Sequence, residues 1–376
     1  MCIWMDRLIN KRKNRPMRIF IGGDIMPGGV LPYQETYIDE GLKAMLSQYD
    51  FRVGTLECAI GDGLPFDDEK IKGRANIIYA RTEDLSRVKE LGFDVVSLAN
   101  NHVFDLGVEG LRNTMQQLTA MGIQYCGAGM NLDEASRPAL VSKDGMTIAF
   151  LAYCMYDSPW LGQVRLAEEN VPGISPLDIT KVVEDIRMAK KNYDKVVVLP
   201  HWGKEYSYEP LPETIEIAKQ MVQAGADAVI GTHPHQVQPM IKIKGVPVCF
   251  SMGNFLFPDF YMQPPRPIWY PDADIDRATI PSVDSYIFPV EKPVLRVWEP
   301  LSRYGMSVDV RLSPHHRISV NPVFTHLSYN NNLCKSGPAK GMRSRLWKES
   351  AKIKCSWIRR MSESLRQRKR EKLQKQ

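Results

Sequence analysis

"FDVVSLANNH", residues 93–102, is the stretch that decides the fold. An apolar run typical of a buried strand ends directly in two amides and a histidine, Asn100, Asn101 and His102. Polar residues at such a place are either turn and helix-cap residues or part of a ligand site. The pattern along the rest of the chain distinguishes these two interpretations.

Apolar stretches of strand length alternate with amphipathic stretches of helix length between residues 18 and 250. The predicted strands cover 18–22, 51–57, 93–99, 147–153, 195–200 and 227–231. The predicted helices cover 33–48, 82–91, 107–121, 176–191 and 211–224. This alternation favours an α/β domain around a largely buried sheet, and we expect these strands to belong to the same sheet.

Residues able to bind a metal follow one predicted strand after another. They are Asp24, Glu57, Asn101, His102, His201, His233 and His235. In open α/β sheets the carboxyl ends of strands border the ligand crevice, so groups far apart in sequence converge there. Carboxylate, amide and imidazole donors suit Mn, Fe or Zn, and a divalent ion held by them activates water. The pattern predicts a site for one or two divalent ions that supports hydrolysis.

Each of these residues also has a purely structural interpretation. A single histidine at a strand end is more often an ordinary structural residue, Asp24 suits a turn, and Asn100-Asn101 suit a helix cap. The proline in His233-Pro234-His235 stiffens that pair and aims both rings from one loop. Four of the seven histidines lie at strand ends together with carboxylates, and this joint pattern favours the metal site.

Composition excludes several classes of protein. The chain has 376 residues and 44% apolar content, enough for a folded core. Its longest apolar runs fall far short of the roughly 20 residues that a membrane helix needs. Seven scattered cysteines without a C-x-x-C pair argue against a disulfide framework and a cysteine-bound zinc site. The N-terminal residues lack the features of a signal peptide, so we expect a cytoplasmic protein.

The two ends are basic and the body is acidic. Residues 335–376 carry 15 Lys/Arg against 3 Glu, and residues 1–18 carry 6 against 1 Asp, which leaves a net charge of −11 between them. Residues 1–16 are a basic extension, and translation starts either at Met1 or at Met17. The segment 331–376 predicts either a solvated or disordered tail or a basic amphipathic helix in peripheral contact with the inner membrane face. Its apolar positions are Leu346, Ile353, Trp357, Met361 and Leu365.

Residues 258–330 follow the alternating region. The part 258–300 is rich in proline and aromatic residues and predicts an extended excursion without regular elements. The part 305–324 alternates polar and apolar residues and predicts a β-hairpin that closes the same domain. No spacing in the chain is typical of a nucleic-acid-binding module, so nucleic acid is not an expected partner.

Six motifs then occur in order: "GGDIMPGG" (22–29), "GTLECAI" (54–60), "SLANNHVFDLG" (97–107), "HWGKEY" (201–206), "GTHPHQVQP" (231–239) and "SMGNFLF" (251–257). In order and spacing, residues 17–257 resemble the bacterial capsule-synthesis proteins called CapA or PgsA, which are associated with poly-γ-glutamate. That family is in turn similar to calcineurin-like metallophosphoesterases. The resemblance implies a layered α/β sandwich of the metallo-dependent phosphatase type, followed by the hairpin and the basic tail.

The resemblance also implies roles for the motif residues. It makes Asp24 a ligand of one metal, Glu57 the bridging carboxylate and Asn101 a ligand of the second metal. His201 would be a single histidine ligand, and His233 and His235 would bind one metal each. His102 would protonate the leaving group. The residues expected beside the ligands or facing the substrate are Asn100, Asp105, Glu205 and Asn254.

This chain departs from the phosphoesterase pattern at two positions. The first motif reads Asp24-Ile25-Met26 where the phosphoesterases have D-x-H, so one metal position loses an imidazole and gains only a thioether. Glu57 replaces an aspartate and lengthens the bridging arm by a methylene.

We therefore expect a metal-dependent hydrolase of capsule or exopolysaccharide synthesis that cleaves a phosphoester or amide-type bond. Its substrate would be an anionic polymer or a phosphorylated precursor. The alternative is a non-catalytic accessory subunit that binds metal and polymer within a capsule synthesis or export complex. Retention of His102 favours the hydrolase, and loss of the first-motif histidine favours the accessory subunit.

Overall fold

Two large β-sheets carry the predicted strands. The computed structural model describes residues 16–63, 65–66, 76–156, 164–264, 267–284, 291–312 and 318–355. The first sheet has the order β22 (Leu333–Lys335), β21 (Ser319–Leu327), β20 (Tyr304–Leu312), β1 (Met17–Ile25), β2 (Phe51–Leu56), β5 (Val95–Ser97) and β6 (Gln124–Cys126), and β15 (Asn254–Leu256) also pairs with β1. The second has the order β13 (Met240–Ile243), β14 (Val246–Cys249), β12 (Ala228–Ile230), β11 (Lys195–His201), β9 (Met146–Cys154) and β8 (Ala139–Lys143).

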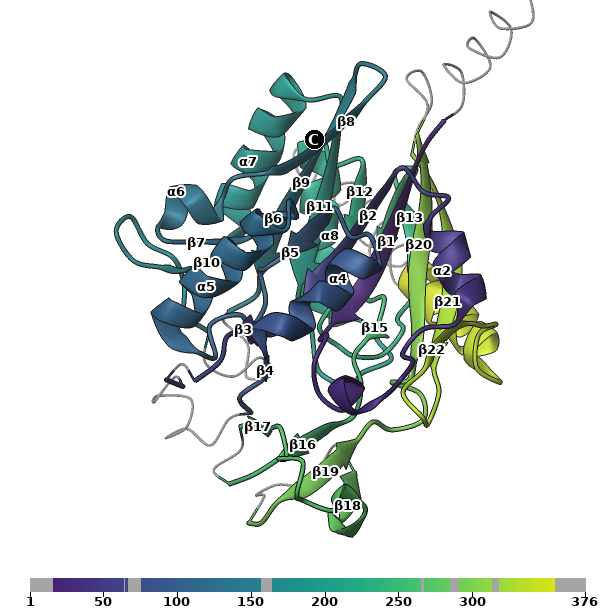
Figure 1. Cartoon of the computed structure of the whole chain (residues 1–376). Coiled ribbons are helices and arrows are strands. Elements are labelled where there is room, and N and C mark those ends of the chain that lie inside the picture. Colours follow the sequence, from purple (N-terminus) through teal and green to yellow (C-terminus); the bar gives the residue numbers. More distant parts are fainter. Residues whose placement is uncertain are drawn as a thin grey trace, which may run out of the picture.

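The expectation of a single sheet is therefore wrong. All six predicted strands are present, but β9, β11 and β12 form a sheet of their own. β8 pairs antiparallel with β9 and closes that edge of the second sheet, so β6 does not continue into it. The buried side chains of both sheets nevertheless form one hydrophobic core, which confirms the predicted layered α/β class (Figure 1).

Helices cover the outer faces of the sheets. α7 (Ile179–Asn192) and α8 (Pro212–Ala224) pack on each other and on the second sheet, while α5 (Gly107–Ala120) packs beside β6 and α2 (Glu40–Leu46) beside β22 (Figure 1). α2 is shorter than the predicted helix 33–48. Its start is fixed by Asp39, whose side chain accepts a hydrogen bond from the Leu42 amide.

The proline-rich stretch contains a regular element after all. A small sheet with the order β17 (Ile268–Trp269), β16 (Phe260–Met262), β19 (Val294–Val297) and β18 (Ser282–Asp284) lies at one end of the molecule (Figure 1). Prolines lie between these short strands and interrupt the alternation of polar and apolar residues that would predict them. The predicted hairpin is confirmed, since β20 and β21 pair antiparallel. Its turn at residues 313–317 lies outside the described residues.

The C-terminal boundary at residue 331 is also wrong. β22 pairs with β21, and residues 342–355 form a helix in which Met342 and Ile353 are buried. Leu346 also packs against the core, so two of the apolar positions predicted to face a membrane face the protein body instead. Residues 1–15, Trp357, Met361 and Leu365 lie outside the described residues. No helix within the described ranges has both the length and the apolar character needed to cross a bilayer.

An irregularity in β1 brings Asp24 to the junction of the sheets. The register of β1 shifts between Ile21 and Asp24 against β2, and again after Asp24 against β15. Such bulges re-aim side chains next to functional sites. Gly23 allows the close approach of β15, because a Cβ atom there would lie 1.9 Å from the Gly253 carbonyl oxygen.

Ending the chain at residue 330 should strongly destabilise the protein. The truncation removes β22 and helix 342–355, with the buried side chains of Leu333, Met342 and Ile353. Each such side chain contributes about 1.5–3 kcal/mol, so we expect Tm to fall by at least about 10 °C in scanning calorimetry. A chain ending at residue 355 is the control and should keep Tm within about 2 °C. A wild-type Tm for the shorter chain would contradict the assignment of this segment to the core.

Candidate metal centre

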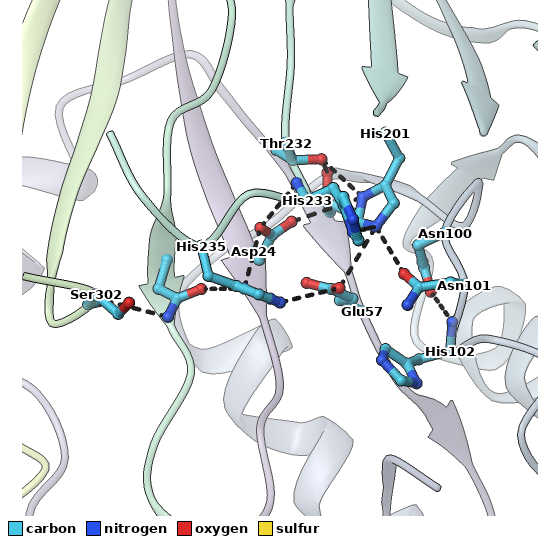
Figure 2. Close-up of polar contacts among 12 residues, drawn as sticks. Asp24, Glu57, Asn100, Asn101, His102, His201, Thr232, His233, His235 and Ser302 are labelled. Carbon is cyan, nitrogen blue, oxygen red and sulfur yellow. Dashed lines mark hydrogen bonds and ion pairs between the residues drawn. The ribbon is translucent and has the colours of Figure 1, made fainter. Parts of the chain in front are cut away.

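Six predicted residues converge where strand ends from the two sheets meet. Figure 2 shows Asp24, Glu57 and Asn101, from the first sheet and its loops, facing His201, His233 and His235 from the second. Asp24 is the penultimate residue of β1, Glu57 follows β2, and His201 ends β11. All six side chains are buried. The convergence follows from the carboxyl ends of β1, β2, β5, β11 and β12 pointing to the same place.

The donors form two sets that share one carboxylate. Ligand atoms of Glu57, His201 and His233 lie within 4.8 Å of one another, and so do those of Asp24, Glu57 and His235. The Oε1 atom of Glu57 is 3.4 Å from Nε2 of His201 and 3.6 Å from Nε2 of His235. Two sets of this kind could hold two ions on either side of Glu57, with one histidine of the His233-Pro234-His235 loop in each set.

Several donor atoms crowd around a single nitrogen of His201. Its Nε2 lies 2.8 Å from Oδ1 of Asn101 and 3.2 Å from Nδ1 of His233, in addition to the Glu57 contact. One imidazole nitrogen carries at most one proton or one lone pair, so it cannot make good hydrogen bonds to all three. Converging donors at such separations are typical of the ligands around a cation.

Three of the four oxygens of the buried carboxylates accept no hydrogen bond from the described residues. They are both oxygens of Glu57 and Oδ1 of Asp24. Burial, and then the charge of Asp24, raises the pKa of Glu57 well above its usual value. Burial also raises the pKa of Asp24 to about 7, although the backbone N–H of His233, 3.3 Å away, favours its ionised form. An isolated carboxylate is costly to bury, and a cation is the partner that would offset this cost.

The histidines are in the state that a metal requires. Burial, followed by the neighbouring imidazoles, lowers the pKa of both His201 and His235 well below its usual value. Both rings are therefore neutral at pH 7 and can offer a nitrogen lone pair. Neutral imidazoles next to carboxylate oxygens that accept no hydrogen bond from the described residues fit a divalent ion bound by nitrogen and oxygen.

Two further side chains orient the rings. The hydroxyl of Thr232 lies 3.0 Å from Nδ1 of His201, which turns Nε2 towards Glu57. Oδ1 of Asn254 lies 2.8 Å from Nδ1 of His235, and the amide nitrogen of Asn254 donates to the Ser302 carbonyl at 3.1 Å. Hydrogen bonds to the far nitrogen of a ligand histidine fix its tautomer and orientation. This is a positioning role for Asn254.

His102 forms a separate dyad beside the cluster. Its Nδ1 is 2.7 Å from Oδ2 of Asp105, and the same oxygen accepts a hydrogen bond of 2.7 Å from the Ile78 amide. Asn100 has a structural use: its amide nitrogen donates to the Leu56 carbonyl, and its oxygen accepts from the amides of His102 and Val103. Asn100 thus ties the loop after β5 to the end of β2.

The backbone at the site is strained. His233, His235 and Tyr206 have positive φ angles of 98°, 52° and 60°. Non-glycine residues rarely adopt this region, and where they do so outside turns they cluster at functional sites. The unusual backbone of the His233-Pro234-His235 loop thus coincides with the candidate metal centre.

Sequence reasoning missed several neighbours of the cluster. Thr232 lies inside the "GTHPH" motif, so its position in the sequence could have identified it as a neighbour of the ligand histidines. The ring of Trp298 lies 4.9 Å from that of His235, and the ring of Tyr206 lies 6.2 Å away. Trp298 has no local motif, because it comes from the proline-rich stretch. Met26, which stands where the phosphoesterases have histidine, has its sulfur 3.3 Å from the Gly28 amide.

Comparison with known proteins gives consistent sequence matches. Residues 18–259 match the profile of the family described as bacterial capsule synthesis protein PGA_cap. The PGA biosynthesis protein CapA of Bacillus subtilis (strain 168) is 35% identical over 181 residues, 48% of this chain and 47% of that protein. The capsule biosynthesis protein CapA of Bacillus anthracis is 32% identical over 271 residues, 68% of this chain and 64% of that protein. The matches thus span less than two thirds of either relative.

One similar solved structure is a phosphatase from Mycoplasma pneumoniae. Its TM-score is 0.46 at 12% identity, and the match covers 83% of this chain and 94% of that one.

Manganese should stabilise the protein more at pH 8 than at pH 6. The raised pKa of Asp24, about 7, means that the ion must displace a proton at pH 6 but hardly at pH 8. Without metal, the folded protein holds the Asp24 proton more tightly than the unfolded chain does, so the stability from Asp24 is lost as pH rises from about 4 through 7. A bound ion stabilises the ionised carboxylate and reverses this loss. We expect an affinity gain of about tenfold from pH 6 to pH 8 through Asp24 alone.

The measurement is Tm against manganese concentration at both pH values. His235→Ala removes the imidazole from the donor set of Asp24 and should lose the pH-dependent part of the stabilisation. Equal gains at pH 6 and pH 8, or an unchanged pH dependence in His235→Ala, would contradict binding of the ion by the Asp24 set.

Proposed function

The chain belongs to the family of bacterial capsule synthesis proteins, and we propose that it is a metal-dependent hydrolase of capsule biosynthesis. The observation that carries this proposal is the buried Glu57 carboxylate, shared by two sets of nitrogen and oxygen donors. The substrate would be an anionic capsule polymer of the poly-γ-glutamate type or a phosphorylated precursor. The bond cleaved would be of the amide or phosphoester type. Two relatives named for PGA and capsule biosynthesis support the process.

The ligand residues would be those of the two donor sets. Asp24, Glu57 and His235 would hold one ion, and Glu57, His201 and His233 would hold a second beside Asn101. Mn, Fe or Zn suits these donors. When bound, a divalent ion supplies Lewis-acid polarisation of the scissile group and a lowered pKa for water.

His102 would provide the proton for the leaving group. Asp105 holds Nδ1 of the ring at 2.7 Å and is itself fixed by the Ile78 amide, so Nε2 is directed away from this dyad. A proton held at Nε2 could pass to a departing oxygen or nitrogen.

A second candidate is the accessory subunit without turnover. Met26 favours it, because the first motif supplies a thioether in place of the imidazole and the Asp24 set has one histidine only. In this case the chain would bind metal and polymer within a capsule synthesis complex.

Metal analysis and a substrate screen separate the two candidates. We expect purified protein to hold one or two equivalents of divalent metal and to hydrolyse a generic phosphoester or a γ-glutamyl amide. His102→Gln should lower kcat by about 10²–10⁴ without changing metal content, because the ring protonates the leaving group but is not a ligand. His326→Gln, on β21, is the matched control. Metal-loaded protein inactive on every substrate would favour the accessory subunit.

The basic C-terminal segment would bring the protein to the inner membrane face. Residues 356–376 carry eight Lys/Arg against two Glu, and basic residues near an anionic surface contribute about 1 kcal/mol each. We expect the full chain to co-sediment with anionic vesicles at low salt and a chain ending at residue 355 to stay in the supernatant. Equal sedimentation of both chains would contradict a membrane role for this segment.

A further inference from the structure

Two neighbouring cavities lie beside the small sheet, and no residue of the metal cluster lines either of them. The larger has a volume of about 700 Å³ and lies between the short helix Leu31–Tyr33, β16 and the turn 328–332. The smaller, of about 610 Å³, is lined by residues 270–273. Both have Tyr33 and Arg277 in their walls. Cavities of these volumes are typical of small-molecule sites.

The guanidinium of Arg277 is a cation shared by the two cavities. Its Cζ atom lies 4.3 Å from the centroid of the Tyr33 ring, and no carboxylate of the described residues forms an ion pair with it. An arginine stacked on an aromatic face directs its N–H groups outward in the plane of the guanidinium, where they bind a carboxylate in a bidentate way. Arg277 is therefore suited to recognise one carboxylate of a ligand.

The Tyr33 ring under this guanidinium is held in place. Its hydroxyl donates a hydrogen bond of 3.0 Å to the Pro271 carbonyl. The ring packs edge to face on Tyr261 of β16, with the centroids 6.0 Å apart. The backbone amide of Tyr33 donates to the Val30 carbonyl at 3.1 Å. Tyr33 thus preorganises Arg277, as recognition of a ligand requires.

The turn between β21 and β22 forms another wall of the larger cavity. Oδ1 of Asn331 accepts a hydrogen bond of 2.8 Å from the Asp259 amide, and its side-chain nitrogen donates to the Asp259 carboxylate at 3.0 Å. Arg303 pairs with the same buried carboxylate at 2.7 Å and lies 4.9 Å from the centroid of Tyr329. The side chain of Tyr329 is 66% exposed. This ring, on a fixed turn, offers an apolar surface with a polar end to a ligand.

The remaining wall of the larger cavity is polar but has no excess of charge. Among the described residues its charged members are Arg277 and Glu35, one of each sign. The other polar side chains in its lining are amides and hydroxyls, from Gln34, Thr36, Ser328, Asn330 and Asn332. Amides donate and accept hydrogen bonds, as hydroxyl groups of a ligand require. A chain with a carboxylate on every unit would be repelled by Glu35, and one arginine could not offset this repulsion.

An aromatic platform, several amides and one stacked arginine together fit an acidic sugar. The apolar face of the sugar ring packs on tyrosine, its hydroxyls bind amides and its carboxylate binds arginine. We propose that the two cavities bind an acidic saccharide segment, with its carboxylate on Arg277 and a sugar ring on Tyr329. This site is distinct from the metal centre, and binding there requires neither metal nor turnover.

The first test compares three ligands on the wild-type protein by calorimetry. A glucuronosyl-glucose disaccharide should bind about tenfold more tightly than the neutral glucosyl-glucose disaccharide, because only the former offers a carboxylate to Arg277. A γ-glutamyl trimer has a carboxylate on every unit and no sugar ring, so it should bind more weakly than the acidic disaccharide. Equal affinity for the two disaccharides, tighter binding of the trimer, or no binding of any of the three overturns the proposal.

The second test locates the saccharide. Arg277→Gln should lose the preference for the acidic disaccharide, and Tyr329→Ala should weaken binding of both disaccharides about tenfold. Arg112→Gln is the matched control and should bind like wild type, because Arg112 lies on α5, pairs with Glu109 and lines neither cavity. A preference that persists in Arg277→Gln overturns the proposal. The wild-type comparison remains decisive even if a variant fails to fold.

Titrations with manganese and with EDTA separate this inference from the proposed function. The affinity for the acidic disaccharide should be the same in both, because no residue of the metal cluster lines the cavities. Binding that requires manganese would place the saccharide at the metal centre and overturn the inference. Saccharide binding without hydrolysis of any substrate would count against the hydrolase alone.

Discussion

The buried carboxylate of Glu57 is the constraint on which the site depends. Its two oxygens lie among three imidazoles and a second carboxylate, and the described residues give them no hydrogen-bond donor. A carboxylate in that position is tolerable either protonated or beside a cation. The neutral histidines on both sides, oriented by Thr232 and Asn254, favour the cation. Burial in this site is also the main cause of the raised pKa of Asp24 and the lowered pKa values of His201 and His235.

The fold supports this carboxylate from two directions. Strands β1, β2 and β5 bring oxygen donors from one sheet, and β11 and β12 bring imidazoles from the other. The bulge at Asp24 and the strained loop at His233 and His235 are local costs of this meeting. The common hydrophobic core of the two sheets offsets these costs, since burial of large apolar side chains is the dominant stabilising contribution.

The sequence allowed the strands and the candidate ligands to be predicted, because both depend on local patterns. Apolar runs such as 195–200 identify a strand, and a polar residue at its end, such as His201, identifies a position in the crevice. Sheet membership could not be predicted, since it depends on pairing between distant strands such as β9 and β11. The strands around Trp298 are too short to show the alternation of polar and apolar residues that predicts a strand. Charge after residue 331 suggested a tail, and composition alone could not reveal that Leu333 pairs into a sheet.

The division of the donors between two sheets links metal binding to the order of folding. Glu57 and His201 are far apart in sequence. Closing the long loop between them carries an entropy penalty of several kcal/mol, which grows only slowly with loop length. Each sheet alone supplies only some of the ligand residues of an ion. The core between the sheets must therefore form before either donor set is complete. An ion bound at this seam then acts as a reversible crosslink between the two sheets. Its residence time would report how firmly they are docked.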